Sequence, residues 1–430
     1  MKMYGIKTGI LTGAVILTSL MTVGCTANKS ADSITEINLV QYKPEAVEAF
    51  EEIERRFNET HDDIHLVIES PNQASTVLKT RFIREDYPDI IGIGGDMDYA
   101  NFLDADLFMD ISDFDGLSEI KSAYMDIEKQ LELIPKDGVF AVPYVANAAG
   151  ILYNKDMFDQ YGWGIPETWN EFTSLCEDIR ANGIQPLYFG FKDTWTCLAP
   201  WNSLVVALCP PDTCSRVNAG ETTFEKEYKD AAVKIKEMLN YTDINPFAYS
   251  YNDACTAFAR GQSAMYVIGS YAVPQIKSVN PDINIDSFVL PANDDEKDNV
   301  LTSGIDLHFS VMKESENKEA AYEVLRFLYE DETIQVYLDN QNAVPCKKGD
   351  FVLPPMLDGM RKYLDEGRLS DYHDHHYPSE MSVDAMLQTY LLDKSENATD
   401  TFLKKFDREW ARYNRDIIKR LEDYKKEESK

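Results

Sequence analysis

Five aromatic side chains fall at the ends of predicted strands or in the loops that directly follow them. The face of an aromatic ring carries negative charge density and stacks against the weakly positive C–H face of a pyranose, while carboxylates and amides bind the hydroxyl groups. Taken singly, each ring is better explained as part of the core. Their shared position favours a carbohydrate site that includes Tyr42, Tyr144, Trp195, Trp201 and Tyr271.

The sequence patterns of the common catalytic sites are absent. The chain contains no GxSxG, HExxH, P-loop or complete EF-hand loop. The segment from Gly92 begins like a dinucleotide-binding turn, but Met97 stands where the third glycine belongs, so we reject a nucleotide site. With 74 Asp and Glu residues, a pair of carboxylates is no evidence for a glycosidase. We expect neither catalysis nor a cofactor.

Histidines and cysteines give no firm indication of a metal site. His373, His375 and His376 are adjacent, and neighbouring side chains rarely converge on one ion, so a solvated loop is favoured over a metal site. No CxxC pair is present, which argues against a zinc ribbon or a thioredoxin-like site. Cys209 and Cys214 bracket a short loop, and both a disulfide and two free thiols remain open.

The first 25 residues have the layout of a secretory signal peptide. Lys2 and Lys7 precede an apolar stretch that is too short to span a bilayer, and small residues precede Cys25. Gly24-Cys25 resembles the end of a bacterial lipobox, in which the cysteine is lipidated and becomes the new N-terminus; Thr22 replaces the usual leucine. Ordinary cleavage nearby and an uncleaved anchor are the alternatives. In each case the body of the chain lies outside the cytoplasm.

Charge narrows the choice of ligand. The formal net charge is −32 at pH 7, which repels phosphate backbones and anionic membranes, so we expect no nucleic-acid partner and a neutral or cationic ligand. The polar residues 26–33 predict a flexible tether, and no later apolar run approaches the roughly 20 residues of a membrane span. The remaining body is long enough for two lobes.

The first part of the body alternates strands with helices. We expect strand 37–42, a helix that opens at Pro44, strand 65–68, a helix over about 73–84 and strand 89–93. This order predicts a doubly wound α/β sheet with parallel strands, which binds ligands at the carboxyl ends of its strands. Tyr42 and the Gly94-Gly95-Asp96 turn therefore lie at the predicted binding edge.

The alternation restarts after Tyr144, and the last third of the chain is predicted to be mostly helical. Further expected elements are a helix from Pro166 to Gly183, strands at 264–268, 288–290 and 308–311, a helix at 317–329 and one from about 399 to 424.

Four sequence blocks resemble the extracellular solute-binding proteins of carbohydrate ABC importers, of the maltose-binding type. The most specific contains Gly138-Val139-Phe140-Ala141-Val142-Pro143-Tyr144 and, shortly after it, Leu152-Tyr153-Asn154-Lys155-Asp156. The four blocks stand in the order of the family and lie at 87–96, 138–172, 258–272 and 315–328.

This resemblance implies a two-lobe α/β fold of the Venus flytrap type with three hinge crossovers, near 142–147, 297–304 and 343–348. A signal peptide (1–24) and a lipidated tether (25–35) would precede a first lobe of 36–145 plus 301–345 and a second lobe of 146–300 plus 346–430. The resemblance also implies sugar contacts from Asp96, Asn147, Asp306 and Tyr271, the last in place of a tryptophan that is usual in the family.

The function implied by the resemblance is that of a monomeric, lipid-anchored receptor on the extracellular face of the cytoplasmic membrane, in a Gram-positive bacterium. It would close on a neutral oligosaccharide and deliver it to the importer's permease. The alternatives are a secreted hydrolase, which needs two carboxylates roughly 5 to 10 Å apart across the cleft, and an adhesin or sensor on the same fold. The identity, linkage and length of the sugar stay open.

We predict that Cys25→Ala yields an untethered or unprocessed protein, because both lipid attachment and the associated cleavage depend on this thiol. Metabolic labelling with palmitate and gel mobility, each with and without globomycin, measure the effect. Cys176→Ala, in the body of the chain, is the control and should keep the label. A wild-type protein that carries no lipid and is processed normally in globomycin would contradict the prediction.

Overall fold

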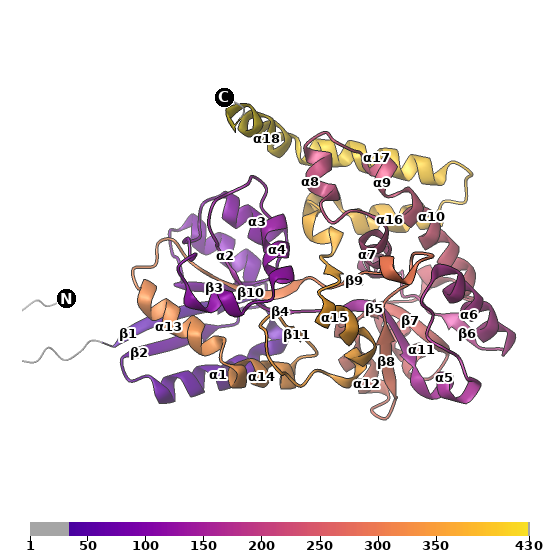
Figure 1. The fold of residues 1–430 in the computed structure, drawn as a ribbon, viewed down its shortest axis with the longest axis horizontal. Helices are drawn as coiled ribbons and strands as arrows, with labels where there is room; N and C mark the ends of the chain where they lie inside the picture. Colours follow the sequence, from indigo (N-terminus) through magenta and orange to yellow (C-terminus); the bar gives the residue numbers. More distant parts are fainter. Residues whose placement is uncertain (1–33, 429–430) are drawn as a thin grey trace, which may run out of the picture.

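The computed structural model describes residues 34–428, so the predicted signal peptide, Cys25 and most of the tether lie outside the described residues. The described chain forms two lobes side by side along the long axis, and each lobe is built around its own β-sheet (Figure 1). The predicted two-lobe α/β fold is confirmed.

The sheet of the first lobe has the strand order β11-β4-β10-β3-β1-β2. As predicted, β1 pairs in parallel with both β2 and β3, while β10 runs antiparallel to β3 and β4. The strands are β1 (Thr35–Gln41), β2 (Ile64–Glu69), β3 (Ile90–Ile93), β4 (Val142–Ala146), β10 (Ile305–Val311) and β11 (Val344–Pro345).

Helices cover both faces of this first sheet. Figure 1 shows α1, α13 and α14 on one face and α2, α3 and α4 on the other. Their bounds are α1 (Val47–Thr60), α2 (Ala74–Ile83), α3 (Met97–Asp104), α4 (Ser122–Gln130), α13 (Lys318–Leu328) and α14 (Asp331–Asn340). In α1 the predicted apolar stripe is buried, with Phe50, Ile53 and Phe57 against the sheet.

The sheet of the second lobe has the order β12-β9-β5-β7-β6, with β8 also paired to β5. Its strands are β5 (Ala149–Asn154), β6 (Gln185–Leu187), β7 (Ser263–Gly269), β8 (Ile285–Phe288), β9 (Leu301–Thr302) and β12 (Leu369–Ser370). The helices of this lobe are α5 (Lys155–Tyr161), α6 (Trp169–Ala181), α7 (Leu198–Leu208), α8 (Thr213–Asn218), α9 (Phe224–Glu227), α10 (Lys229–Met238), α11 (Tyr251–Ala259), α12 (Val273–Val279), α15 (Arg361–Glu366) and α16 (Val383–Leu392).

Two predicted elements differ from the structure. The strand expected at 288–290 ends at Phe288, because β9 replaces β8 beside β5: Ile151 pairs with Phe288, whereas Ala149 pairs with Thr302. The single helix expected from about 399 to 424 is two helices, α17 (Ala398–Tyr413) and α18 (Arg415–Glu428). They break at Asn414, which is buried and donates its side-chain amide to the carbonyl of Trp410 at 3.3 Å.

The lobes are joined by three crossovers. Residues 147–148 connect β4 to β5, residues 303–304 connect β9 to β10, and the third crossover leaves the first sheet after β11. The first two are bonded together, since the Asn147 amide donates to the Gly304 carbonyl (3.2 Å) and the Ser303 hydroxyl donates to the Asn147 carbonyl (2.8 Å). β9, which begins at the expected boundary of 301, belongs to the second sheet.

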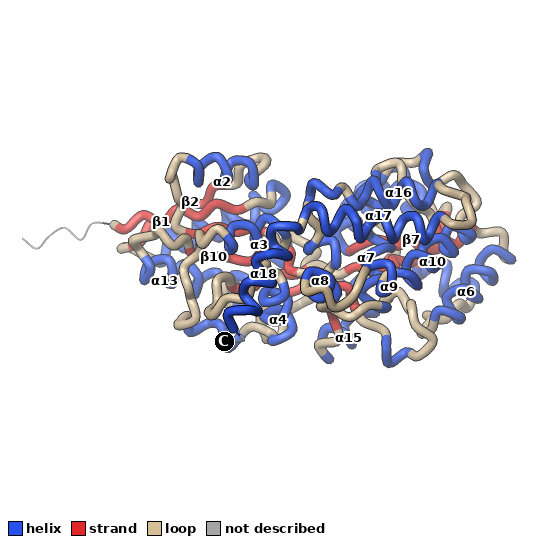
Figure 2. The backbone as a smooth tube through the Cα atoms, turned by 90° about the horizontal axis from the view of Figure 1, so that it is seen from above, coloured by secondary structure: helices blue, strands red, loops and turns tan. Residues whose placement is uncertain are grey.

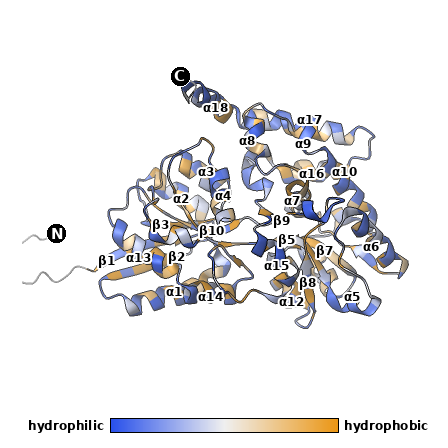
Figure 3. Ribbon diagram, in the orientation of Figure 1, coloured by the Kyte–Doolittle hydropathy of each residue, from blue (hydrophilic) through white to orange (hydrophobic). Residues whose placement is uncertain are grey.

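Apolar side chains are concentrated in the strands and in the inner faces of the helices, while α18 is mostly hydrophilic (Figure 3). Large buried clusters lie in each lobe. Within residues 34–428, no helix combines the length and the apolar character that a membrane crossing requires.

The second crossover has no room for a side chain at Gly304. A β-carbon there would lie 2.2 Å from Asp371 Oδ1 and 2.8 Å from His375 Cε1. We predict that Gly304→Ala lowers the free energy of unfolding by about 1–3 kcal/mol, the usual range for overpacking, as measured by urea denaturation. The control is Gly164→Ala, whose β-carbon meets nothing within 4 Å. An equal, small effect of both variants would contradict tight packing at the hinge.

Candidate ligand-binding site between the two lobes

A row of polar side chains follows the carboxyl edge of the first sheet and reaches the hinge. We call it the polar row; it consists of Tyr42, Lys43, Asp306 and Asn147. Lys43, two residues beyond β1, forms an ion pair of 2.5 Å with Asp306, at the start of β10. The Asp306 backbone carbonyl accepts a hydrogen bond from the Tyr42 hydroxyl (2.5 Å), and the Asn147 side-chain amide donates to Asp306 Oδ1 (3.4 Å). The side-chain oxygen of Asn147 is buried and has no partner among the described residues.

Burial and pairing shift the pKa of Lys43 in opposite directions. Burial lowers the pKa of its ammonium group, but the charge and the hydrogen bond of Asp306 outweigh burial, so the pKa is raised. The side chain is therefore a permanent cation, fixed beside Asp306. Sequence reasoning missed Lys43, although a lysine next to Tyr42 at the predicted binding edge of so acidic a chain was the available indication.

Asp96 has one oxygen engaged and one available. Its Oδ1 accepts from the backbone N–H of Asp98 (2.8 Å) and so caps α3. Its Oδ2 accepts no hydrogen bond within residues 34–428 and lies, like the Tyr42 hydroxyl, beside Gly94. Burial raises the pKa of this carboxyl, while His375 from the opposite lobe opposes the shift. Capping and ligand binding are thus compatible roles, one for each oxygen.

Three aromatic rings form the facing surface in the second lobe. Trp195 lies 5.0 Å from Tyr251 and 6.3 Å from Tyr271 between ring centroids, and Trp195 and Tyr271 are 42% and 39% exposed. The Tyr271 ring folds back over Gly269, where a β-carbon would lie 2.2 Å from the ring, so the glycine is needed for this ring position. We call Trp195, Tyr251 and Tyr271 the aromatic platform.

A pocket of about 620 Å³ separates the polar row from the platform. It brings together three of the predicted site residues, Asn147, Tyr271 and Asp306, and adds Lys43 and Tyr251. Tyr42 and Trp195 join through their contacts with Asp306 and Tyr271. The arrangement offers ring faces on one side and hydrogen-bonding groups on the other, which suits a hydroxyl-rich ligand with apolar faces.

Two predicted aromatic contacts lie in the cores instead. Tyr144 has no exposed surface, and its ring packs against Phe309, Tyr329 and Tyr337 inside the first lobe. Trp201 is equally buried in α7 and donates its indole N–H to the Tyr377 hydroxyl at 3.2 Å. A ring without accessible surface cannot stack on a ligand, so the expectation for both residues is corrected.

The segment 371–376 is also corrected, because residues 371–373 are buried and residues 374–376 are half-buried rather than solvated. Asp371 and His373 are 2% and 1% exposed, and His375 Nδ1 lies 2.8 Å from Asp371 Oδ1. Burial lowers the pKa of His375, but Asp371 outweighs burial and raises it to about 10. Conversely, burial raises the pKa of Asp371, but His375 and His376 lower it to about 2. The result is a buried ion pair that contacts the hinge at Gly304.

The two other open questions concern metals and cysteines. No group of three or more side chains that could ligate a metal occurs within the described residues. Cys209 and Cys214 are both buried free thiols; the Cys209 thiol donates to the Glu227 carbonyl, and the Cys214 thiol lies 3.9 Å from the Tyr228 hydroxyl.

Comparison with known proteins gives a consistent result. Residues 38–335 match the family model of the bacterial extracellular solute-binding proteins. The chain is 29% identical over 363 residues to the multiple sugar-binding protein of Streptococcus mutans, covering 81% of this chain and 84% of that protein. It is 20% identical over 323 residues to the melibiose/raffinose/stachyose-binding protein MelE of Bacillus subtilis, covering 72% and 74%.

Solved structures with the same fold include two of RafE. The apo-form from Streptococcus pneumoniae superimposes with a TM-score of 0.78 at 25% identity and covers 88% of this chain and 97% of that chain. RafE in complex with raffinose superimposes with a TM-score of 0.71 at 25% identity and covers 88% and 100%.

The ion pair of His375 and Asp371 predicts a pH-dependent contribution to stability. The pKa of His375 is higher in the folded chain, about 10, than the roughly 6.5 of an unperturbed histidine. The contribution is therefore complete below pH 6.5 and is lost as the pH rises through 10. We expect the melting-temperature difference between wild type and His375→Gln to be large at pH 6 and small at pH 10.

The control for this pH effect is His65→Gln, since His65 is exposed on β2. Calorimetry at both pH values measures each difference. A His375→Gln difference that stays constant between pH 6 and pH 10 would contradict the buried ion pair.

Proposed function

Because this chain belongs to the bacterial extracellular solute-binding proteins, we propose that it captures a neutral oligosaccharide between its lobes and delivers it to the permease of an ABC importer. The observation that carries the proposal is the aromatic platform facing the polar row across the pocket of about 620 Å³. Pockets of roughly 300–1,000 Å³ hold small ligands, so this one admits a short saccharide.

Unpaired hydrogen-bond acceptors near the pocket favour a ligand that supplies donors. Asp96 Oδ2 accepts no hydrogen bond in the described chain and Asn147 Oδ1 is buried without a partner, whereas the positive charge of Lys43 is already paired with Asp306. An anionic sugar would therefore meet the carboxylate of Asp96 and no unpaired lysine, while neutral hydroxyls would make charge-assisted hydrogen bonds with Asp96. Related proteins are named for melibiose, raffinose and stachyose, and we propose the same class of ligand here.

Binding is proposed to close the lobes about the three crossovers. The chain superimposes better on the apo-form of RafE than on its raffinose complex, at equal identity and equal coverage of this chain. We therefore assign the described lobes to the ligand-free arrangement. A sugar that contacts Asp96 and Asn147 on one side and Tyr271 on the other would draw the lobes together, because only the closed arrangement satisfies both.

The chain is not an enzyme, since the family consists of transport-binding proteins, and the hydrolase alternative is withdrawn. We further propose a lipid anchor on Cys25 and a position at the outer face of the cytoplasmic membrane, as a monomer. The first described strand, β1, starts at the end of the first lobe farthest from the second lobe (Figure 1). A role as sensor or adhesin would leave sugar binding intact but sugar uptake independent of the protein.

Titration calorimetry with melibiose, raffinose and stachyose tests the proposal. We expect micromolar affinity, about −8 kcal/mol, with the sugar recovered unchanged. Tyr271→Ala removes part of the platform and should weaken binding about tenfold or more, the effect of roughly 1–3 kcal/mol for a stacking aromatic.

A matched control is Tyr161→Ala, because Tyr161 is also 39% exposed but lies at the end of α5, outside the site. Its affinity should equal that of the wild type. Equal binding by wild type and Tyr271→Ala would remove the platform from the site, and no binding of any neutral oligosaccharide would overturn the proposed function.

A further inference from the structure

We propose that α18 is a strap that ties the second lobe to the first in the ligand-free arrangement and so weakens sugar binding by opposing closure. This inference rests on the proposed function and names a regulation of the same site. We define the strap as α18 together with Asp104 and Glu221, which form ion pairs with Arg420 and Lys425.

The strap connects both lobes through charged side chains. α18 follows α17 of the second lobe and extends over the first lobe, as two perpendicular views agree (Figures 1 and 2). Arg420 binds Asp104, the last residue of α3, with both guanidinium nitrogens at 2.7 Å. Lys425 pairs with Glu221 of the second lobe at 3.3 Å. One helix thus holds a carboxylate on each side of the interlobe boundary.

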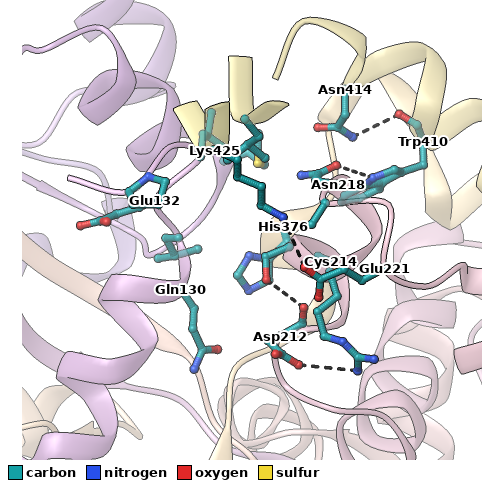
Figure 4. A pocket seen from close by; sticks show the side chains of 18 residues that line it. Gln130, Glu132, Asp212, Cys214, Asn218, Glu221, His376, Trp410, Asn414 and Lys425 are labelled. Atoms are coloured by element: carbon teal, nitrogen blue, oxygen red, sulfur yellow. Dashed lines mark hydrogen bonds and ion pairs between the residues drawn. The ribbon is translucent and has the colours of Figure 1, made fainter. Parts of the chain in front are cut away.

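Below α18 the lobes face each other across a second cavity, of about 320 Å³ (Figure 4). Gln130 and Glu132 line its first-lobe wall, Asp212 and Asn218 line its second-lobe wall, and Lys425 extends from α18. The side-chain oxygen of Gln130 is buried and has no partner among the described residues. Because the walls are separated here, the contact of Arg420 with Asp104 is a direct interlobe link at this end of the boundary.

This link is specific to one arrangement of the lobes. A bidentate arginine–carboxylate pair requires two parallel hydrogen bonds of normal length, so a rotation of one lobe relative to the other breaks it. The described lobes superimpose better on apo RafE than on the raffinose complex. The pair therefore stabilises the ligand-free arrangement, and closing must give it up.

The size of the effect follows from the exposure of the pair. The Arg420 side chain is 50% exposed and that of Asp104 is 22% exposed, so water and salt screen the interaction. Because its geometry is bidentate, the pair of Arg420 and Asp104 lies at the upper end of the interaction energies of exposed ion pairs. Removing it should tighten sugar binding about twofold to fivefold at low salt, and the gain should shrink at high salt.

The first experiment measures raffinose affinity at low and high salt for wild type, Arg420→Ala, Asp104→Ala and the double variant. We expect each single variant to bind more tightly and the double variant to gain nothing further, because all three lack the same pair. The control is Arg415→Ala on the same helix, because the Arg415 side chain is 82% exposed and pairs with the neighbouring Asp416 at 3.5 Å, within the helix. The charge-swapped variant Asp104→Arg/Arg420→Asp should restore wild-type affinity.

The second experiment needs no ligand. Spin labels on Glu51→Cys in α1 and Asp178→Cys in α6 report the distance between the lobes by double electron–electron resonance. The six native cysteines of the body are buried, so they do not take up the label. In the free protein, Arg420→Ala should broaden this distance distribution toward the closed arrangement, while Arg415→Ala should not.

The outcomes separate the two proposals. If no variant binds a sugar, the proposed function fails. The distance measurement then decides alone whether α18 holds the lobes in the ligand-free arrangement. If Arg420→Ala binds with unchanged or weaker affinity and its distance distribution equals that of the wild type, the strap is overturned.

Discussion

The carboxylate of Asp306 is the contact on which the cleft depends. It lies at the start of β10, directly after the second crossover, and it binds Lys43 from the end of β1 and Asn147 from the first crossover. Only 15% of its side chain is exposed, and an unpaired charge at such a depth costs several kcal/mol. The pairing therefore fixes three distant parts of the chain in one position relative to each other.

Because of this fixed row, the first lobe presents its polar groups already in place. The aromatic platform belongs to the other sheet and is held by different contacts, among them the tight turn at Gly269. The two halves of the site are thus each held by contacts within their own part of the chain, and the proposed closure moves one relative to the other. Ligand binding then costs little side-chain conformational entropy, and most of its free-energy cost lies in the movement of whole lobes.

The sequence predicts the part of the site that follows from strand order. Tyr42 and Asp96 follow neighbouring strands of one sheet, so strand prediction alone places them at one edge, whereas Asp306 is expected only from the family resemblance. Tyr144 and Trp201 were misplaced for a related reason: strand or loop position does not tell which way a ring points, and both rings turn into cores that are assembled from remote helices.

The segment 371–376 shows a different limit. Its composition of histidine and aspartate is typical of a solvated loop, and its burial follows from pairing within the segment and from contact with Gly304 of the hinge. The pairing is local, but the contact with Gly304 joins segments about 70 residues apart, and no local sequence pattern indicates it. Likewise, the break at Asn414, which turns α18 toward the first lobe, depends on tertiary burial and not on helix propensity.

The position of β1 has a mechanical consequence. This strand carries the N-terminal connection of the body and is hydrogen-bonded in parallel on both sides, to β2 and to β3. A force applied through an N-terminal attachment acts along the strand axis and loads these hydrogen bonds together in shear, instead of opening them one by one. Resistance to forced unfolding is a matter of unfolding rate. A receptor held this way at a surface exposed to flow would be pulled along β1, where hydrogen bonds on both sides of the strand share the load.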